Sequence, residues 1–134
     1  MPMKYFLPFL FLTLLFVSTV HSCKKEKEQS CISYTNADVV KVTAPSAAAV
    51  NQEVDITITY TVYNGCGKYL GLSASSSNNT TTISVKTKYE GCVCTAVFLS
   101  GNVIYKFKAA APGKYYLQFP EGSPAGITDS ITVN

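Results

Sequence analysis

Apolar and polar residues alternate along most of the chain from Asp38 onward. The clearest run lies between Val54 and Tyr63, where valine, isoleucine and tyrosine alternate mainly with threonine. Because successive side chains of a strand point to opposite faces of a sheet, this run predicts a half-buried strand. The same alternation recurs in five further segments: Val40/Val42, Ile83/Val85 with Tyr89, Val103/Tyr105/Phe107, Tyr115/Leu117/Phe119, and Ile127 with Ile131/Val133. No window shows a helical period, so the pattern predicts an all-β domain.

Residues that favour turns separate these predicted strands. They are Ala44-Pro45-Ser46, Asn64-Gly65-Cys66-Gly67, residues 75–79, Gly101-Asn102, Pro112-Gly113 and residues 120–126. Short strands at this spacing indicate an immunoglobulin-like antiparallel β-sandwich of about seven strands, with a small barrel as the alternative. We expect the segment from Asp38 to Thr43 to be an uncovered edge strand, which could pair with another chain.

The first 22 residues have the pattern of a secretory signal peptide. Lys4 precedes an apolar stretch from Tyr5 to Val17, and small or polar residues follow up to Ser22. A membrane-spanning helix needs about 20 apolar residues, and the polar segment arrives too early for that. We therefore expect residues 1–22 to be removed.

The four residues Val20-His21-Ser22-Cys23 resemble a bacterial lipobox, which implies that Cys23 carries acyl chains such as palmitate. Residues 24–30 are charged or polar and cannot bury anything, as expected of a flexible tether. The predicted organisation is a lipoprotein signal peptide over residues 1–22, a lipidated cysteine and charged tether over 23–36, and the β-sandwich over 37–134.

Several segments of the mature chain are similar to bacterial immunoglobulin-like modules. The proline and strand between Pro45 and Tyr63 resemble their first two strands, and residues 112–117 resemble their last hairpin. Together with the cysteine-containing residues 64–67 and 89–94, the chain resembles small cysteine-containing lipoproteins of Bacteroidota-type bacteria. The resemblance implies a β-sandwich in the cell envelope, lipid-anchored at the outer membrane on its periplasmic or surface-exposed side, and it implies no activity.

Four cysteines remain once Cys23 is acylated: Cys31, Cys66, Cys92 and Cys94. An even number in an oxidising compartment predicts disulfides. Cys92 and Cys94 are two residues apart in a predicted strand, so they share a face and suit two different partners better than each other. We expect one bridge from Cys31 and one from Cys66 to this pair, with the assignment open.

The alternative for these cysteines is a redox or metal site. Zinc accepts four thiolates, but structural zinc sites usually need two close ligand pairs, and only Cys92 and Cys94 are close in sequence. The sole histidine is His21, inside the predicted signal peptide. The mature chain therefore lacks the imidazoles of copper sites, and we expect neither a metal nor another cofactor.

Composition argues against further function classes. The formal net charge is +3, and the chain contains no arginine, the favoured residue for recognising phosphate. Nucleic-acid binding is therefore not expected. With no catalytic histidine in the mature chain, no nucleophile elbow and no phosphate-binding loop, we expect no catalytic residues and no enzyme.

Two other features could support binding or modification. Tyr63 and Tyr116 are predicted on faces opposite the core, where aromatic rings can stack on sugars or anchor an interface, although cross-strand packing is the commoner role. Asp129-Ser130-Ile131 resembles an O-glycosylation acceptor of Bacteroidota envelope proteins, with Ser130 as the modified residue.

These observations predict a non-enzymatic, lipid-anchored envelope protein that acts as a binding or structural module for a protein or glycan partner. One alternative is a thiol redox or metal-handling protein that uses Cys66, Cys92 and Cys94. Another is a glycan-binding accessory lipoprotein.

Overall fold

The computed structural model describes residues 31–122 and 125–134. The predicted signal peptide (residues 1–22), Cys23 and residues 24–30 lie outside the described residues. Within the described residues the chain forms nine strands and no helix: β1 (Ile32–Asn36), β2 (Asp38–Thr43), β3 (Ala47–Ala48), β4 (Val54–Val62), β5 (Gly67–Ser77), β6 (Thr80–Glu90), β7 (Leu99–Phe107), β8 (Gly113–Phe119) and β9 (Ile127–Val133).

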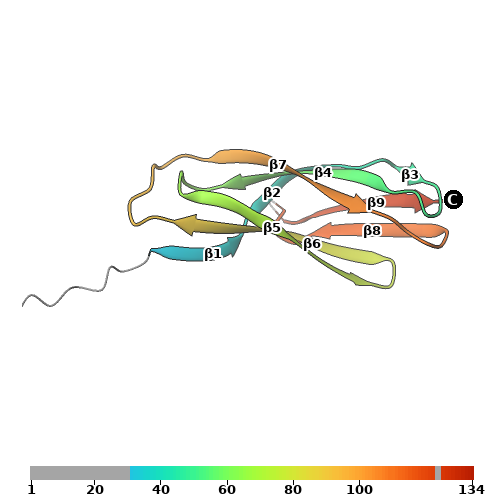
Figure 1. Ribbon diagram of the computed structural model, residues 1–134. Helices are drawn as coiled ribbons and strands as arrows, with labels where there is room; N and C mark the ends of the chain where they lie inside the picture. Colours follow the sequence, from blue (N-terminus) through green and yellow to red (C-terminus); the bar gives the residue numbers. More distant parts are fainter. Residues whose placement is uncertain (1–30, 123–124) are drawn as a thin grey trace, which may run out of the picture.

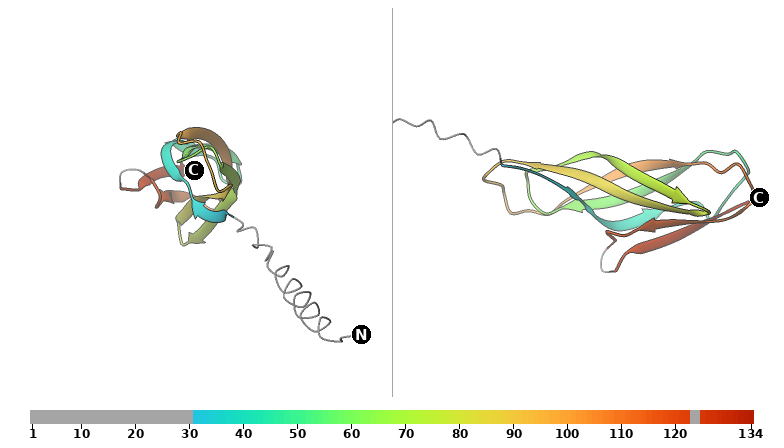
Figure 2. Two further views of the ribbon diagram at one scale, coloured as in Figure 1. Left: turned by 90° about the vertical axis from the view of Figure 1, so that its left-hand side faces the viewer. Right: turned by 90° about the horizontal axis from the view of Figure 1, so that it is seen from below.

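The strands form two sheets packed as an elongated sandwich (Figure 1). One sheet has three strands in the order β2-β4-β7. The other has six, in the order β1-β6-β8-β9-β3, with β5 also paired to β6. The first described residues and the C-terminus lie at opposite ends of the long axis (Figure 2). The described residues contain no helix that could cross a membrane.

Strand β6 organises the larger sheet because it is long enough to pair with three neighbours. Its edge toward β5 is paired in antiparallel fashion from Thr80 to Tyr89. Its other edge pairs with β1 near its C-terminal end and in parallel with β8 near its N-terminal end. As a result β1 and β5 flank the C-terminal end of β6 on opposite sides, which positions the cysteines described below.

The core lies between the two sheets and is formed by alternate residues of the strands. Along β6 every second side chain is buried, from Thr81 to Tyr89. The largest fully buried apolar side chains come from both sheets: Val39, Ile56, Ile58, Ile83, Val85, Leu117, Phe119 and Ile131. The period of two in the sequence is therefore the period of burial, as half-buried strands require.

A polar cluster forms where the chain passes from β1 in one sheet to β2 in the other. The Asn36 side-chain amide donates to the Glu121 carboxylate, which Ser84 Oγ also approaches at 3.3 Å. Lys86 Nζ donates to Asn36 Oδ1 at 2.8 Å. These contacts hold the crossover against β6 and against the segment that follows β8.

The prediction of an all-β sandwich is confirmed, but it is not antiparallel throughout, because β6 pairs with β8 and β3 pairs with β9 in parallel. Five of the six predicted alternating segments turn the expected residues toward the core. The strand count differs, since nine strands replace about seven. The sandwich also starts earlier than expected, because β1 occupies residues that were assigned to the tether and pairs with β6 along its length. Asp38 to Thr43 is an edge strand of the smaller sheet, as predicted, but it is not uncovered throughout, because Val39 forms a parallel bridge with Gly122.

Three local predictions are wrong. The strand register shifts between Val39 and Lys41, so Val39 is buried while Val40 is exposed, and of the predicted Val40/Val42 face only Val42 packs against the core. Gly101 and Asn102 do not form a turn but lie inside β7, because the Tyr60 ring covers Gly101 from the neighbouring strand. Residues 75–77, which are all serine, also belong to a strand, β5, because their backbone pairs with β6.

Candidate functional site

Cys31, Cys66, Cys92 and Cys94 form two disulfides at the end of the sandwich where the described chain begins. Cys31 is bonded to Cys92, with 4.9 Å between the Cα atoms, and Cys66 is bonded to Cys94, with 5.5 Å between the Cα atoms. The predicted pattern of one bridge from Cys31 and one from Cys66 is confirmed. The structure decides the assignment that the sequence left open.

Strand register explains this pairing. On one edge of β6, Ile32 lies opposite Glu90, which brings Cys31 beside the residues that follow β6. On the other edge Gly67 lies opposite Tyr89, which brings Cys66 to the same place. The backbone completes the junction, since the Gly91 N–H donates to the Cys31 carbonyl at 2.9 Å.

Cys92 and Cys94 lie in a loop after β6 and not in a strand, which corrects the premise of the sequence argument. Gly91 makes this loop possible. Its φ is 145°, and a Cβ built on it would lie 2.8 Å from the Cys66 sulfur. A side chain at residue 91 would therefore collide with the second disulfide.

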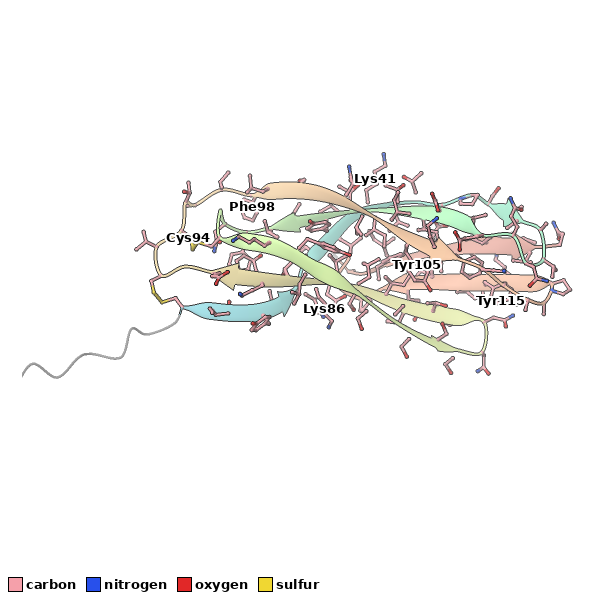
Figure 3. The ribbon with its side chains drawn as sticks, in the orientation of Figure 1. Lys41, Lys86, Cys94, Phe98, Tyr105 and Tyr115 are labelled. Atoms are coloured by element: carbon pink, nitrogen blue, oxygen red, sulfur yellow. A yellow bond between two sulfur atoms is a disulfide. The ribbon has the colours of Figure 1, made fainter. Side chains whose placement is uncertain are left out.

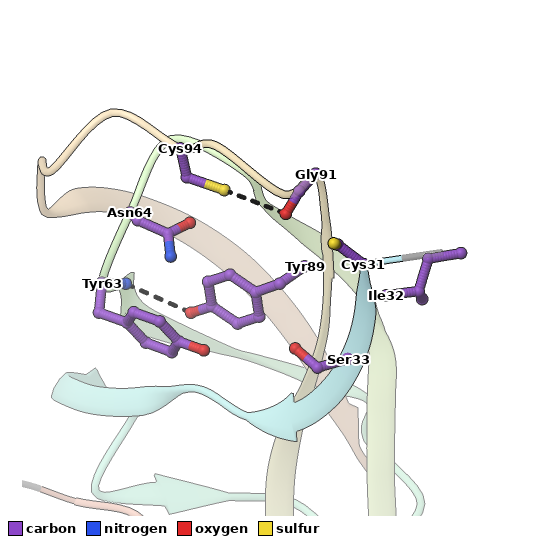
Figure 4. A pocket seen from close by; sticks show the side chains of 8 residues that line it. All are labelled: Cys31, Ile32, Ser33, Tyr63, Asn64, Tyr89, Gly91 and Cys94. Atoms are coloured by element: carbon purple, nitrogen blue, oxygen red, sulfur yellow. Dashed lines mark hydrogen bonds between the residues drawn. The ribbon is translucent and has the colours of Figure 1, made fainter. Parts of the chain in front are cut away.

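A shallow groove of about 300 Å³ runs beside the disulfides (Figure 4). Tyr63 and Tyr89 form part of its wall, with ring centroids 4.1 Å apart and planes within 19°. The Cys94 sulfur closes one end and lies 3.5 Å from the Gly91 carbonyl oxygen. The full lining is Cys31, Ile32, Ser33, Tyr63, Asn64, Tyr89, Gly91 and Cys94.

The two tyrosines differ in exposure. Tyr89 is buried and accepts a hydrogen bond on its hydroxyl from the Tyr63 backbone N–H at 3.2 Å. Tyr63 is 53% exposed, so its ring is held by Tyr89 and still accessible from solvent. A second hollow of about 190 Å³ adjoins Tyr63 and is lined by Phe98, Thr61 and the start of β2, among others.

Charged groups lie close to this end but outside the groove. Glu90 pairs with Lys88 at 3.2 Å and with Lys68 at 4.0 Å on the outer face of the larger sheet. The groove itself is lined by hydroxyl, amide, apolar and disulfide groups. It therefore offers hydrogen bonds and an aromatic face, but no ionised side chain, to a bound molecule.

The acidic residues considered in the sequence lie elsewhere. Glu53 and Asp55 are both exposed and share Lys106, whose Nζ lies 2.9 Å and 3.0 Å from their carboxylate oxygens. Hydrogen bonds from Lys106 to Glu53 and then to Asp55 raise the pKa of this lysine. Among the described residues no group of three or more histidine, cysteine, aspartate or glutamate side chains is placed to hold a metal ion.

The remaining predicted residues are scattered. Cys23 lies outside the described residues. Ser130 is partly buried in β9 opposite Tyr116, whose side chain is exposed as predicted. Phe98 and Asn64 were not identified from the sequence as residues that line a pocket. The apolar Val97-Phe98 pair, which follows two cysteines, was a signal that could have identified Phe98.

A family model described as the ORF11 beta-sandwich domain matches residues 56–133. Searches of curated proteins and of solved structures returned no match. The matched range begins in β4 and ends with the last residue of β9, so it includes Cys66, Cys92 and Cys94 but not Cys31.

Proposed function

The chain belongs to the ORF11 beta-sandwich domain family, and we propose that it is a non-enzymatic protein of the bacterial cell envelope, lipid-anchored at the outer membrane through Cys23, that serves as a binding or structural module. We further propose that it is a cysteine-containing lipoprotein of Bacteroidota type.

The observation that supports this proposal most directly is the disulfide at the first described residue, Cys31. Cys31 follows Cys23 by eight positions and is covalently bonded to Cys92, so the sandwich is closed immediately after the short charged segment. A domain locked at the point where an anchor would enter can be held at a membrane without its fold being pulled open. Two disulfides in a domain of this size are typical of exported proteins.

The groove supports a binding role in preference to catalysis. Its polar groups are the hydroxyls of Ser33, Tyr63 and Tyr89 and the amide of Asn64. Groups of this kind donate and accept hydrogen bonds, and none of the side chains that line the groove is a carboxylate, an amine or an imidazole. The proposal therefore assigns the polar groups of the groove to recognition or to stability.

The lipid anchor is tested by expressing the full chain in a bacterium that processes lipoproteins. The expected product begins at Cys23, carries acyl chains by intact mass and sediments with the outer membrane. A Cys23→Ser variant should lose the acyl mass and leave the membrane fraction. Wild-type protein that is cleaved elsewhere, or recovered soluble and unacylated, would refute the anchor.

Glycan binding is the second candidate, and the accessible ring of Tyr63 favours it. Because Tyr89 already holds that ring, a sugar stacking on it would lose little conformational freedom of the protein. We expect Tyr63→Ala to weaken binding of an envelope polysaccharide about tenfold, the equivalent of one good stacking contact. Tyr116→Ala, which removes an exposed tyrosine of another part of the sheet, is the matched control, and equal affinities of both variants would exclude this site.

A further inference from the structure

Exposed apolar side chains gather in the loop between β6 and β7. Val93 is 95% exposed and Phe98 is 79% exposed, and Val97 and Leu99 are also exposed. Ile32, which follows Cys31 and lines part of the groove, is 41% exposed (Figure 4). We call the loop 91–98 together with Ile32 the apolar tip.

This tip is built to hold its apolar side chains in solvent. Val93 lies between two cysteines that are both in disulfides, so its backbone cannot fold back to bury the side chain. The loop is also tied to the β4–β5 connection, since the Gly65 N–H donates to the Thr95 carbonyl at 2.9 Å. Rigid exposure of large apolar groups is characteristic of surfaces that contact a partner or a membrane.

The position of the apolar tip indicates whether it contacts a partner or a membrane. Val93 is adjacent to Cys92, and Cys92 is bonded to Cys31, where the described chain begins. The eight positions from Cys23 to Cys31 span at most about 29 Å when fully extended. If Cys23 is acylated, the tip therefore lies at the end of the domain that the anchor brings within reach of the bilayer, the end that carries Cys94 and Phe98 in Figure 3, whereas the C-terminus lies at the other end (Figure 1).

We propose that the apolar tip is a membrane-contact surface, with Val93 and Phe98 entering the interfacial region of the bilayer that holds Cys23. This inference rests on the proposed lipid anchor. Apolar side chains at the boundary of headgroups and acyl chains gain free energy by leaving water, and flanking tyrosine and lysine side chains are well suited to the polar layer above them. Tyr63 and Lys68 occupy such flanking positions near the tip.

This contact would fix the orientation of the domain relative to the membrane. An acyl anchor on a short segment leaves the domain free to tilt, whereas a second contact at the tip would direct the long axis of the sandwich away from the membrane. The β3–β4 and β7–β8 connections at the C-terminal end would then face the partners.

The chain contains no tryptophan, so a single introduced tryptophan reports its own surroundings without background. Val93→Trp and Phe98→Trp place the probe on the tip, and Tyr116→Trp, on an exposed position of β8, is the control. Each acylated protein is reconstituted in vesicles of phosphatidylethanolamine and phosphatidylglycerol, with or without nitroxide-labelled acyl chains. The two tip variants should show blue-shifted emission and lose most of it to the nitroxide lipid, whereas Tyr116→Trp should keep both its emission maximum and its intensity.

A tip that does not touch the bilayer would give Val93→Trp and Tyr116→Trp the same emission maximum and the same weak quenching, which would overturn the inference. The anchor is controlled separately. The Cys23→Ser mature chain, with an N-terminal hexahistidine tag held by nickel-chelating lipid, presents the tip to the same vesicles without acylation. Tip quenching in this form would support the inference even if native acylation failed, and its absence in both forms would exclude it.

Discussion

Tyr63, the residue that follows β4, donates its backbone N–H to the hydroxyl of Tyr89 in β6, and the two rings stack with their centroids 4.1 Å apart. The two residues belong to different sheets, so this contact ties the sheets together at the end that carries both disulfides. The same contact sets the orientation of the exposed Tyr63 ring in the groove. The pair therefore links the packing of the two sheets to the geometry of the groove.

Removing the Tyr89 hydroxyl should destabilise the domain. In Tyr89→Phe the stacking is retained, but the Tyr63 N–H loses its acceptor in a partly buried position, which costs about 1 kcal/mol. Urea unfolding with both disulfides intact measures the change. Tyr116→Phe is the control, because its ring is exposed on the outer face, and its free energy of unfolding should stay within about 0.5 kcal/mol of the parent. Equal effects of the two variants would contradict the assigned contact.

The two disulfides should contribute differently. Cys66 and Cys94 are 28 residues apart and join loops at the ends of β4 and β6, so replacing both by alanine should cost about 3 to 4 kcal/mol of global stability. Cys31 and Cys92 are 61 residues apart, but β1 is mostly exposed and pairs only with β6. Without this bridge β1 can separate from β6 while the rest of the domain stays folded. We therefore expect the free energy that protects the β1 amides from exchange to fall by more than the free energy of global unfolding.

Hydrogen exchange and urea unfolding of the two double variants check this distinction. An equal fall in global stability for both would show that β1 unfolds only with the whole domain. The intact mass of the parent before and after reduction, with thiol alkylation, also tests the thiol alternative. Bridges that resist reduction in the folded protein support a structural role, whereas a readily reduced Cys66–Cys94 bridge would favour redox chemistry.

Gly67 at the start of β5 should not accept a side chain. A Cβ at this position would lie 2.7 Å from Val62 Cβ and 2.8 Å from the Tyr89 ring, both of them buried neighbours. Gly67→Ala should therefore destabilise the domain by about 1 to 3 kcal/mol through overpacking. Gly65→Ala is a matched control in the same loop, because its nearest contact is Thr95 Cβ at 3.4 Å. Thermal unfolding compares them, and an unchanged midpoint for Gly67→Ala would contradict the packing.

Tyr60 should titrate at higher pH than an ordinary tyrosine. Partial burial, and then the nearby Tyr69, raises the pKa of Tyr60 above 10.0. The folded state thus holds this proton to higher pH than the unfolded chain, so the associated stability is complete below about pH 10 and is lost as the pH rises through the raised pKa. Ultraviolet difference titration should show one phenol that ionises at higher pH than an ordinary tyrosine, and this phenol should be missing in Tyr60→Phe. Stability of Tyr60→Phe should fall less steeply in this alkaline range, and an unchanged slope would contradict the shift.

Much of the sandwich could be predicted because burial in strands is a local pattern. The alternation in β4, β6, β8 and β9 identified buried residues such as Ile56, Ile83, Leu117 and Ile131. The pattern failed where a neighbour across the sheet decides the conformation. Gly101 has the appearance of a turn residue in the sequence, but the Tyr60 ring covers it within β7. The serines at residues 75–77 extend β5 because they pair with β6.

The candidate site was less predictable for the same reason. The count of cysteines indicated two bridges, but the choice of Cys92 for Cys31 depends on the register of β1 with β6. The stacking of Tyr63 on Tyr89 depends on how the two sheets pack. The exposure of Val93 depends on a loop held between two disulfides. From its apolar side chain alone, Val93 would have been assigned to the core.

The sequence by itself determined that this chain alternates in burial, forms an all-β domain and carries an even set of cysteines after Cys23. These properties follow from residue type and local spacing. Only the tertiary structure decided the bridge partners, the groove at Tyr63 and the apolar tip at Val93. Those features depend on pairing between residues far apart in the chain, and that pairing is selected by the free energy of the whole packed sandwich and not by any single segment.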